Sequence, residues 1–237
     1  MRASFQFAVV ATAAVLLQTP SFAGQVFFSN LVEPGDRYGP DSLGIGHTPA
    51  YLPGDTGQSF SATGFTPSAT FKLTSFDIAL GYVDTFPNPP GPNQAVVFLD
   101  SDAGGSPGST IESWDLSNLP TDNCGPCPLT TVTSVGNPTL IAGNQYWIVA
   151  TGGLQTFDNW SLTLIGSSFS PLASRSIKNG VDSGWVLISP PNTRQGALEV
   201  FGDAVPEPRT LSLMTFVLLA VFLWRSRVMK HRSKCLY

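Results

Sequence analysis

Between residues 24 and 203, short runs of apolar, aromatic and β-branched residues alternate with clusters of Gly, Pro, Asn and Asp. No part of this segment repeats its apolar residues with the period of an amphipathic helix. Short strands separated by turn residues are typical of an all-β fold, so we predict a single jelly-roll-like antiparallel β-sandwich over residues 24–203. The expected strands are Gln25–Ser29, Gln58–Ala62, Thr70–Val83, Gln94–Asp100, Thr110–Leu116, Thr130–Val135, Thr139–Ile141, Gln145–Thr151, Trp160–Ile165, Gly184–Ser189 and Ala197–Phe201.

Two of these expected strands carry further information. Apolar residues of the strand over 70–83 change phase at Thr74–Ser75, and because side chains alternate with a period of two, this predicts a bulge or bend. The strand over 94–100 is almost continuously apolar, which predicts a central place in a sheet. Loops, which commonly carry function on a rigid sandwich, are expected between the strands. The main ones are Gly35–Pro53, Pro87–Asn93, Ala103–Ser109, Leu119–Pro128 and Ser189–Arg194.

Residues 1–23 have the features of a secretory signal. Arg2 supplies the positive start, residues 5–17 form the apolar stretch, and Ser21-Phe22-Ala23 has small residues at its first and last positions. We therefore expect an N-terminal signal helix that signal peptidase removes by cleavage between Ala23 and Gly24.

Residues 204–237 read as a second terminal signal. The run Leu211–Trp224 carries no charge and spans about 21 Å as a helix, short of the roughly 30 Å hydrocarbon core. Basic residues crowd the tail over 225–237, and the positive-inside rule places this tail in the cytoplasm. Bilayer thinning and snorkelling cover the mismatch. We predict a short transmembrane helix over 211–224.

The tripeptide Pro206-Glu207-Pro208, the hydrophobic helix and the basic cluster, in this order, resemble the PEP-CTERM sorting tail of Gram-negative bacteria. The resemblance covers about residues 205–232. Arg209 stands where the family more often has Ser or Thr, and residues 228–237 extend beyond the usual pattern. The resemblance implies that an exosortase, a membrane enzyme with a Cys nucleophile, processes the chain at or near the motif. It also implies a link to exopolysaccharide and biofilm.

A second resemblance spans about residues 56–165. Short segments there resemble the choice-of-anchor surface domains of bacteria, type R in particular. The segments are Gln58–Phe60, Phe71–Phe76, Asp100–Gly108 and Leu140–Trp147. Such domains often carry a PEP-CTERM tail and have no established activity, so the resemblance implies a surface β-sandwich without a catalytic residue.

Composition narrows the classes of function. Charged residues make up 12% of the chain, and residues 24–205 hold 15 acidic against 5 basic side chains, a net charge of −10. This segment lacks the basic footprint of a nucleic-acid-binding protein. The chain has 2 His and 3 Cys, which leaves little for metal or nucleophilic chemistry. His47 lies in an expected loop without a nucleophile elbow.

Cys124-Gly125-Pro126-Cys127 has the sequence of a thioredoxin active site. In thioredoxins this motif opens a helix that lowers the pKa of the thiol. Here prolines flank the motif and no helix or βαβ unit accompanies it. Because secretion favours oxidation, we expect a short disulfide loop between Cys124 and Cys127, with redox activity as the alternative.

Acidic residues offer two other candidate sites. Asp100 and Asp102 match the first and third positions of a calcium loop, but the fifth and twelfth positions lack the expected side chains. Turns between strands use the same residues, so an ordinary turn is the favoured interpretation. This pair is the one calcium candidate, and we expect no other metal and no cofactor. The pairs Asp100/Asp102 and Glu112/Asp115 are the candidates for a glycosidase, whose chemistry needs two carboxyl groups.

Aromatic side chains stack on sugar rings, which makes tryptophans candidates for glycan binding. Trp160 and Trp185 flank expected loops and are the candidate glycan contacts. Core packing remains the default for each of these two and for Trp114 and Trp147, because Trp is highly buried on average. In Tyr146-Trp147, strand alternation puts one side chain toward the core and the other outside.

Together these observations predict a secreted, non-enzymatic protein at the surface or in the extracellular matrix of a Gram-negative bacterium. Its expected partners are signal peptidase and an exosortase during export, the membrane before processing, and exopolysaccharide, but not nucleic acid. Two alternatives stay open. One is a polysaccharide hydrolase that uses two carboxylates of the domain, and the other is a surface protein that keeps its C-terminal helix.

Overall fold

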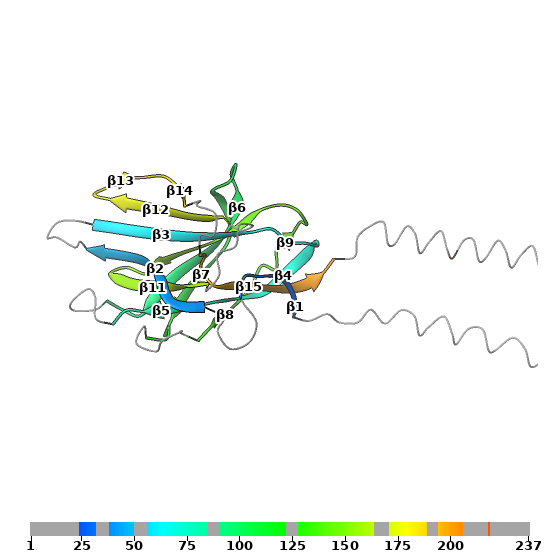
Figure 1. Cartoon of the computed structure of the whole chain (residues 1–237), viewed down its shortest axis with the longest axis horizontal. Helices are drawn as coiled ribbons and strands as arrows, with labels where there is room; N and C mark the ends of the chain where they lie inside the picture. The colour runs from blue at the N-terminus through cyan, green and yellow to red at the C-terminus, as the bar shows by residue number, and fades with distance from the viewer. Residues whose placement is uncertain are drawn as a thin grey trace, which may run out of the picture.

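Antiparallel β-sheets make up almost all of the structure, a computed structural model (Figure 1). The residues that it describes are 24–31, 38–49, 56–84, 91–121, 128–163, 171–188, 194–205 and 218. All strand pairs between the named strands are antiparallel, which confirms the predicted all-β class. In this described part, no helix is both long and apolar enough to cross a membrane.

The smaller sheet has five strands in the order β1-β15-β4-β8, with β9 also paired to β4. Their bounds are β1 (Gln25–Ser29), β4 (Phe71–Ile78), β8 (Thr130–Thr133), β9 (Thr139–Leu140) and β15 (Leu198–Ala204). The register shifts opposite Thr74, because Phe201 pairs with Ser75 whereas Gly202 pairs with Leu73. This irregularity confirms the predicted bulge.

The larger sheet has ten strands, in the order β5-β11-β2-β3-β10-β6-β7, and β12 pairs with β3, β13 and β14. Their bounds are β2 (Tyr38–Pro49), β3 (Thr56–Phe65), β5 (Leu80–Tyr82), β6 (Gln94–Asp102), β7 (Pro107–Ser117), β10 (Tyr146–Gly152), β11 (Thr156–Thr163), β12 (Leu172–Lys178), β13 (Val181–Asp182) and β14 (Val186–Ile188). The apolar strand β6 lies between β10 and β7, which confirms its predicted central place.

The main core fills the space between the two sheets. Its members alternate along each strand with residues of the other face, as a strand period of two requires. Large side chains with no exposed surface include Phe65, Phe71, Phe76, Trp160 and Leu99. Phe27 stacks on Phe71 with ring centroids 4.1 Å apart.

Three strands of the larger sheet, β2, β12 and β13, were not expected from the sequence. Residues 38–49 were predicted to lie in a loop, but they form β2, and His47 therefore lies on a strand. Gly44 and Gly46 explain how a strand rich in Gly and Pro fits there, because a Cβ on either would approach the ring of Phe157 to 2.7 or 2.9 Å. Residues 172–178 form β12, which pairs along almost the whole of β3.

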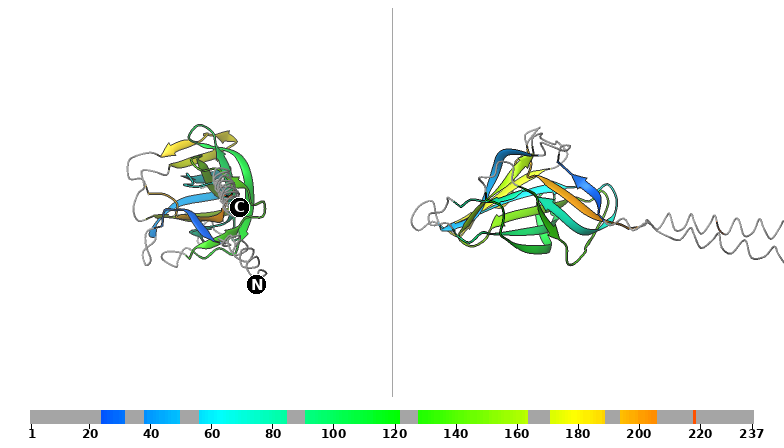
Figure 2. Two further views of the ribbon diagram at one scale, coloured as in Figure 1. Left: turned by 90° about the vertical axis from the view of Figure 1, so that its right-hand side faces the viewer. Right: turned by 90° about the horizontal axis from the view of Figure 1, so that it is seen from below.

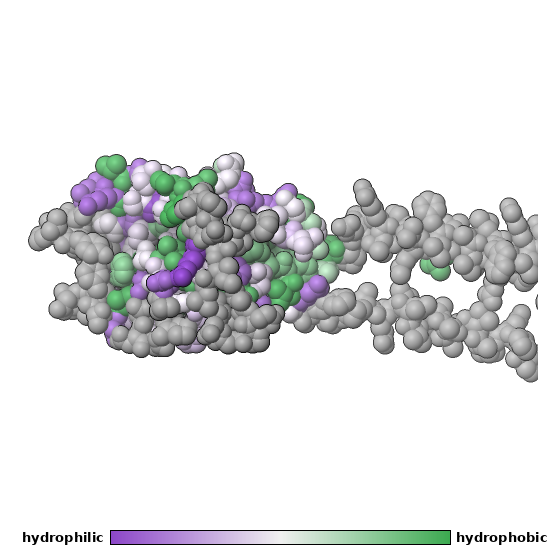
Figure 3. Space-filling view, viewed as in Figure 1, coloured by the Kyte–Doolittle hydropathy of each residue, from purple (hydrophilic) through white to green (hydrophobic). Residues whose placement is uncertain are grey.

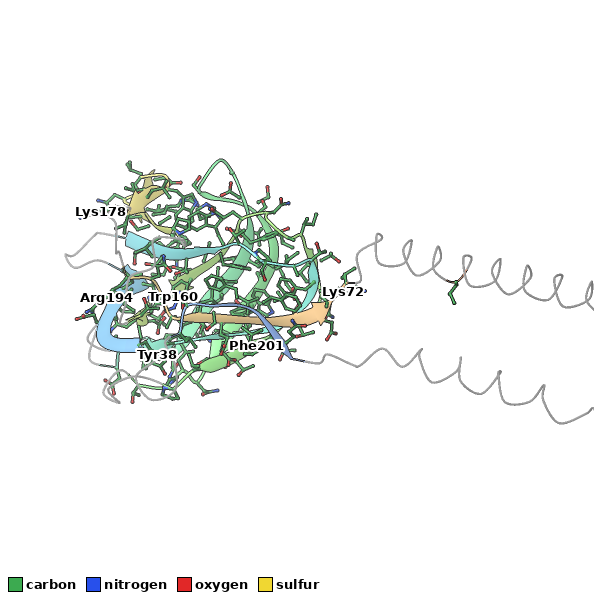
Figure 4. The ribbon with its side chains drawn as sticks, turned by 45° about the vertical axis from the view of Figure 1, so that its right-hand side comes forward. Tyr38, Lys72, Trp160, Lys178, Arg194 and Phe201 are labelled. Carbon is green, nitrogen blue, oxygen red and sulfur yellow. The ribbon has the colours of Figure 1, made fainter. Side chains whose placement is uncertain are left out.

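Both ends of the domain lie at one pole, as the views in Figure 2 show. Gln25 of β1 is opposite Gly202 of β15, and the backbone N–H of Val205 donates to the carbonyl of Thr70. We call this end, formed by residues 24–26, 66–70, 141–144 and 203–205, the terminal pole. The opposite end, at the β12–β13 turn over residues 178–181, is the distal pole. Lys72 and Lys178 mark the two ends in Figure 4.

Candidate functional site

A second apolar cluster lies on the outer face of the larger sheet. It is built from side chains that point away from the main core, because they occupy the alternate positions of β3, β10 and β12. Its buried members are Ala62, Trp147, Val149 and Ala173, and the half-buried Phe60, Phe98 and Trp185 pack against them. The face is therefore apolar rather than fully solvated, and it presents aromatic rings at its surface.

The β12–β14 segment brings Trp185 onto this face. Asn179 and Gly180 both have positive φ angles, 51° and 75°, and form the two-residue turn between β12 and β13. Gly184, with φ 65°, turns the chain again, and its backbone N–H donates to the Asp182 carboxylate over 2.9 Å. These two turns fold the chain back so that Trp185 packs over β3.

Phe60, Arg175, Asp182 and Trp185 form one cluster, which we call the aromatic platform. Phe60 and Arg175 are direct partners across β3 and β12. The Phe60 and Trp185 rings meet edge to face, with centroids 6.2 Å apart and an interplanar angle of 67°. The Arg175 guanidinium carbon lies 5.5 Å from the Phe60 centroid and 5.9 Å from the Trp185 centroid, within the range of cation–π attraction.

Asp182 holds the guanidinium in place through a two-point ion pair. Arg175 Nε donates to Asp182 Oδ1 over 2.9 Å, and Nη2 donates to Oδ2. The hydrogen bonds from Arg175 and Gly184 lower the pKa of Asp182 to about 2, and the same pairing raises the pKa of Arg175. The side chains of Arg175 and Asp182 remain 31% and 43% exposed, so the ion pair is open to a ligand and carries no net charge.

Exposed apolar side chains border the platform. Val181, Val186 and Leu187 follow one another along β13 and β14 and each is largely exposed. Figure 3 shows hydrophobic surface over this hairpin. The arrangement can stack a flat apolar ring face and offer polar donors and acceptors at its rim, but Asp182, held ionised, is no proton donor at neutral pH.

The two tryptophans predicted as glycan contacts lie in different environments. Trp185 lies in the platform. The prediction for Trp160 is wrong, because Trp160 is 0% exposed in the main core (Figure 4) and its indole N–H donates to the carbonyl of Ala197 over 3.1 Å. Its neighbour Gly196 leaves room for the ring, since a Cβ there would lie 2.2 Å from it.

The other two tryptophans of the described residues, Trp114 and Trp147, are structural. Tyr146 faces the main core and Trp147 the outer cluster, as alternation predicts, although Trp147 is also buried. Trp114 packs edge to face on Phe76, with centroids 5.0 Å apart, and its indole N–H donates to the carbonyl of Thr133 over 3.0 Å.

Hydrogen bonds occupy Asp102, one of the two residues of the calcium candidate. Asp102 accepts from the backbone N–H of Gly105 and from the side chains of Gln145 and Trp147, over 2.9 to 3.1 Å. Asp100 is buried, and burial raises its pKa against a lowering hydrogen bond from Thr110. No group of three or more possible metal ligands occurs among the residues that the structure describes.

In the second carboxylate pair, Glu112 is held by hydrogen bonds and Asp115 is exposed. Glu112 accepts hydrogen bonds from the backbone N–H groups of Val135 and Gly136 and from the Ser134 hydroxyl, over 2.7 to 3.0 Å. Burial raises the pKa of Glu112, but these hydrogen bonds together lower it. Glu112 thus ties the edge strand β7 to the turn after β8.

One acidic residue without a sequence signal stands out in the main core. Asp158 on β11 is 0% exposed, lies between Ile45 and Tyr82 across the sheet, and neither of its carboxylate oxygens has a hydrogen-bond partner in the structure as described. Burial raises the pKa of Asp158 to about 8. Strand alternation explains its direction, because Trp160 two residues later also faces the core.

Several predicted sites lie outside the described residues. They are the signal cleavage residue Ala23, the cysteines Cys124 and Cys127, the motif Pro206-Glu207-Pro208, and the helix over 211–224 apart from Leu218. Gly24, on the other side of the expected cleavage point, directly precedes β1 and has φ 86°.

Three members of the platform were not predicted from the sequence. Phe60, Arg175 and Asp182 are distant in the chain, and only the pairing of β3 with β12 brings Phe60 and Arg175 together. One signal was present: Asn179-Gly180 between two β-rich runs indicates a tight hairpin. No protein-family model matches the chain, and comparison with curated proteins finds no match. The function is therefore inferred from the chain's own residues.

Proposed function

We propose that this chain is a secreted, non-enzymatic surface or matrix protein of a Gram-negative bacterium that contacts exopolysaccharide through the aromatic platform. The single observation that supports this most is the cluster of Phe60, Trp185 and the Arg175–Asp182 ion pair on one open face. In this proposal the fold is a jelly-roll-like sandwich, and its role is adhesive or structural.

The chemistry of the platform favours a neutral sugar. A pyranose ring has an apolar face that stacks on an aromatic side chain, while its hydroxyl groups bond to polar groups at the rim. Asp182 offers acceptor oxygens and Arg175 offers donors, and together they are neutral. The net charge of −10 on residues 24–205 opposes an anionic polysaccharide at long range.

Delivery to the surface rests on the two terminal signals. Signal peptidase would release the chain at Ala23–Gly24, and an exosortase would act at Pro206-Glu207-Pro208. The shared exit of both domain ends at the terminal pole supports this arrangement. The platform lies away from this pole, because Arg175 in the middle of β12 pairs with Phe60 of β3, five residues before the end of β3 that leads into the pole.

Binding of the full chain, purified in detergent, to the producer's exopolysaccharide tests the proposal. Trp185→Ala should weaken binding about fivefold, since one aromatic stacking contact is worth on the order of 1 kcal/mol. Ile111→Ala, which truncates an exposed apolar side chain on β7, is the matched control and should bind normally. Equal affinity of the Trp185→Ala and parent chains, with both folded, would reject the platform as the contact site.

A further inference from the structure

The terminal pole is a continuous surface made by four chain segments. Besides the β1–β15 pair, the turn after β9 is fixed there by two hydrogen bonds. The N–H of Ala142 donates to Thr70 Oγ1 over 3.2 Å and the N–H of Gly143 to the carbonyl of Pro67 over 3.0 Å. The pole is therefore one rigid surface rather than separate loop tips.

This surface exposes two large apolar side chains and carries little charge. Val26 is 44% exposed and Ile141 51% exposed, and both belong to the pole. The turn over residues 66–70 carries no charged residue. Asp203, the one charged residue of the pole, pairs in register with Lys72, which places opposite charges side by side. Figure 3 shows hydrophobic surface at this end of the domain.

The sequence beyond the pole limits how far it lies from the bilayer. Five residues, 206–210, separate Val205 from the apolar run that begins at Leu211. The six steps from Val205 to Leu211 reach at most about 20 Å when fully extended. With the tail inserted, the bilayer surface must therefore lie close to Val205, and the pole is the part of the domain nearest to it.

We propose that the terminal pole docks on the lipid bilayer, with Val26 and Ile141 in the headgroup region, for as long as the C-terminal tail is attached. This inference rests on the membrane-inserted tail of the proposed function. The charge pattern agrees, because an acidic domain is repelled by anionic lipid, whereas the one charge of the pole, Asp203, is balanced by Lys72 beside it. Apolar side chains at the interface then add attraction in proportion to their buried area.

The test uses the full chain in vesicles of phosphatidylethanolamine and phosphatidylglycerol. Native cysteines are replaced by serine, and one cysteine is introduced at Val26, at Ile141, or at Val181 on the distal pole as the control. Each variant carries an environment-sensitive fluorophore, and quenching by headgroup-labelled lipid is measured after flotation has shown that the chain is inserted. Labels at 26 and 141 should be quenched and blue-shifted, and the label at 181 should not.

The other outcomes distinguish lipid docking from insertion of the tail and from a protein partner. Equal quenching at 141 and 181 in chains that float would overturn the docking while leaving the inserted tail intact. Chains that do not float would overturn both the inserted tail and the docking. Labels at 26 and 141 that resist a water-soluble quencher in native membranes, but are not quenched by lipid in pure vesicles, would assign the pole to a protein partner and reject lipid. In a docked chain, Ile141→Asp should reduce the quenching of the label at 26.

Discussion

The main core and the outer-face cluster bury aromatic side chains by different means. In the main core, rings such as Phe71 and Trp160 are enclosed by both sheets and have no exposed surface. On the outer face, Phe60 and Trp185 pack on one sheet only, and their other contact is the guanidinium of Arg175. The first region depends on close packing from all sides, whereas the second keeps its rings partly open to solvent.

The two regions accept polar and charged groups under different conditions. A closed core tolerates a Trp N–H only with a partner, which the Ala197 carbonyl supplies. It tolerates the unpaired carboxyl of Asp158 only in its neutral form. On the open face, by contrast, the Arg175–Asp182 pair stays charged on both sides because water still reaches it.

The largest expected effect concerns Asp158 in the main core. Its folded pKa of about 8 lies above its unfolded value near 4, so the folded state binds the extra proton between these pH values. The contribution of Asp158 to stability should therefore be complete below pH 4 and fall by about 1.4 kcal/mol per pH unit up to about pH 8. Urea unfolding across this range measures it. Asp158→Asn should flatten the slope, and an unchanged slope in that variant would contradict the assignment.

Trp160→Ala should give the next largest effect. Removing a fully buried Trp leaves a cavity and costs about 3–5 kcal/mol of unfolding free energy. Denaturant unfolding at one pH compares it with Trp185→Ala, whose half-buried side chain should cost clearly less. Similar losses in the two variants would mean that the platform is as closed as the core.

Close packing around Trp160 gives a smaller effect. Gly196→Ala would place a Cβ 2.2 Å from the Trp160 ring, and overpacking of this kind typically costs about 1–3 kcal/mol. Gly57→Ala, on β3, is the matched control, because a Cβ there meets nothing within 4 Å. Thermal unfolding of the two variants measures the difference in their melting temperatures. Equal melting temperatures would mean that the Trp160 ring moves to make room for the added Cβ.

The smallest expected effect is the response of the platform to pH and salt. The folded pKa of Asp182 is about 2, below its unfolded value, so the ion pair is present above about pH 4 and is lost as pH falls through 2. Binding of exopolysaccharide should hence be constant between pH 5 and 8, and nearly constant with salt because stacking is not screened. Isothermal titration over both ranges checks this. A steep loss of affinity with salt would indicate a charged ligand instead.

Local pattern accounts for much of the fold. Alternation located the central strand β6 and the bulge opposite Thr74, because both are visible in a single run of residues. Strand β2 escaped prediction because its Gly and Pro residues resemble a loop, and only packing against Phe157 explains them. The candidate site was harder to predict than the fold. Trp160 and Trp185 both flank turn residues, and only the pairing of whole strands decides which ring is enclosed in the core.

The position of β15 has a mechanical consequence for a protein held by its tail. β15 runs toward the terminal pole between β1 and β4, paired to both along its length. Tension between a ligand on the platform and an anchor beyond Val205 would pull β15 along its own axis. Ladder hydrogen bonds lie across the strands, so such a pull shears the bonds of two ladders together instead of opening them one at a time. A tether beyond Val205, as in the proposed function, would therefore load both ladders of β15 in shear.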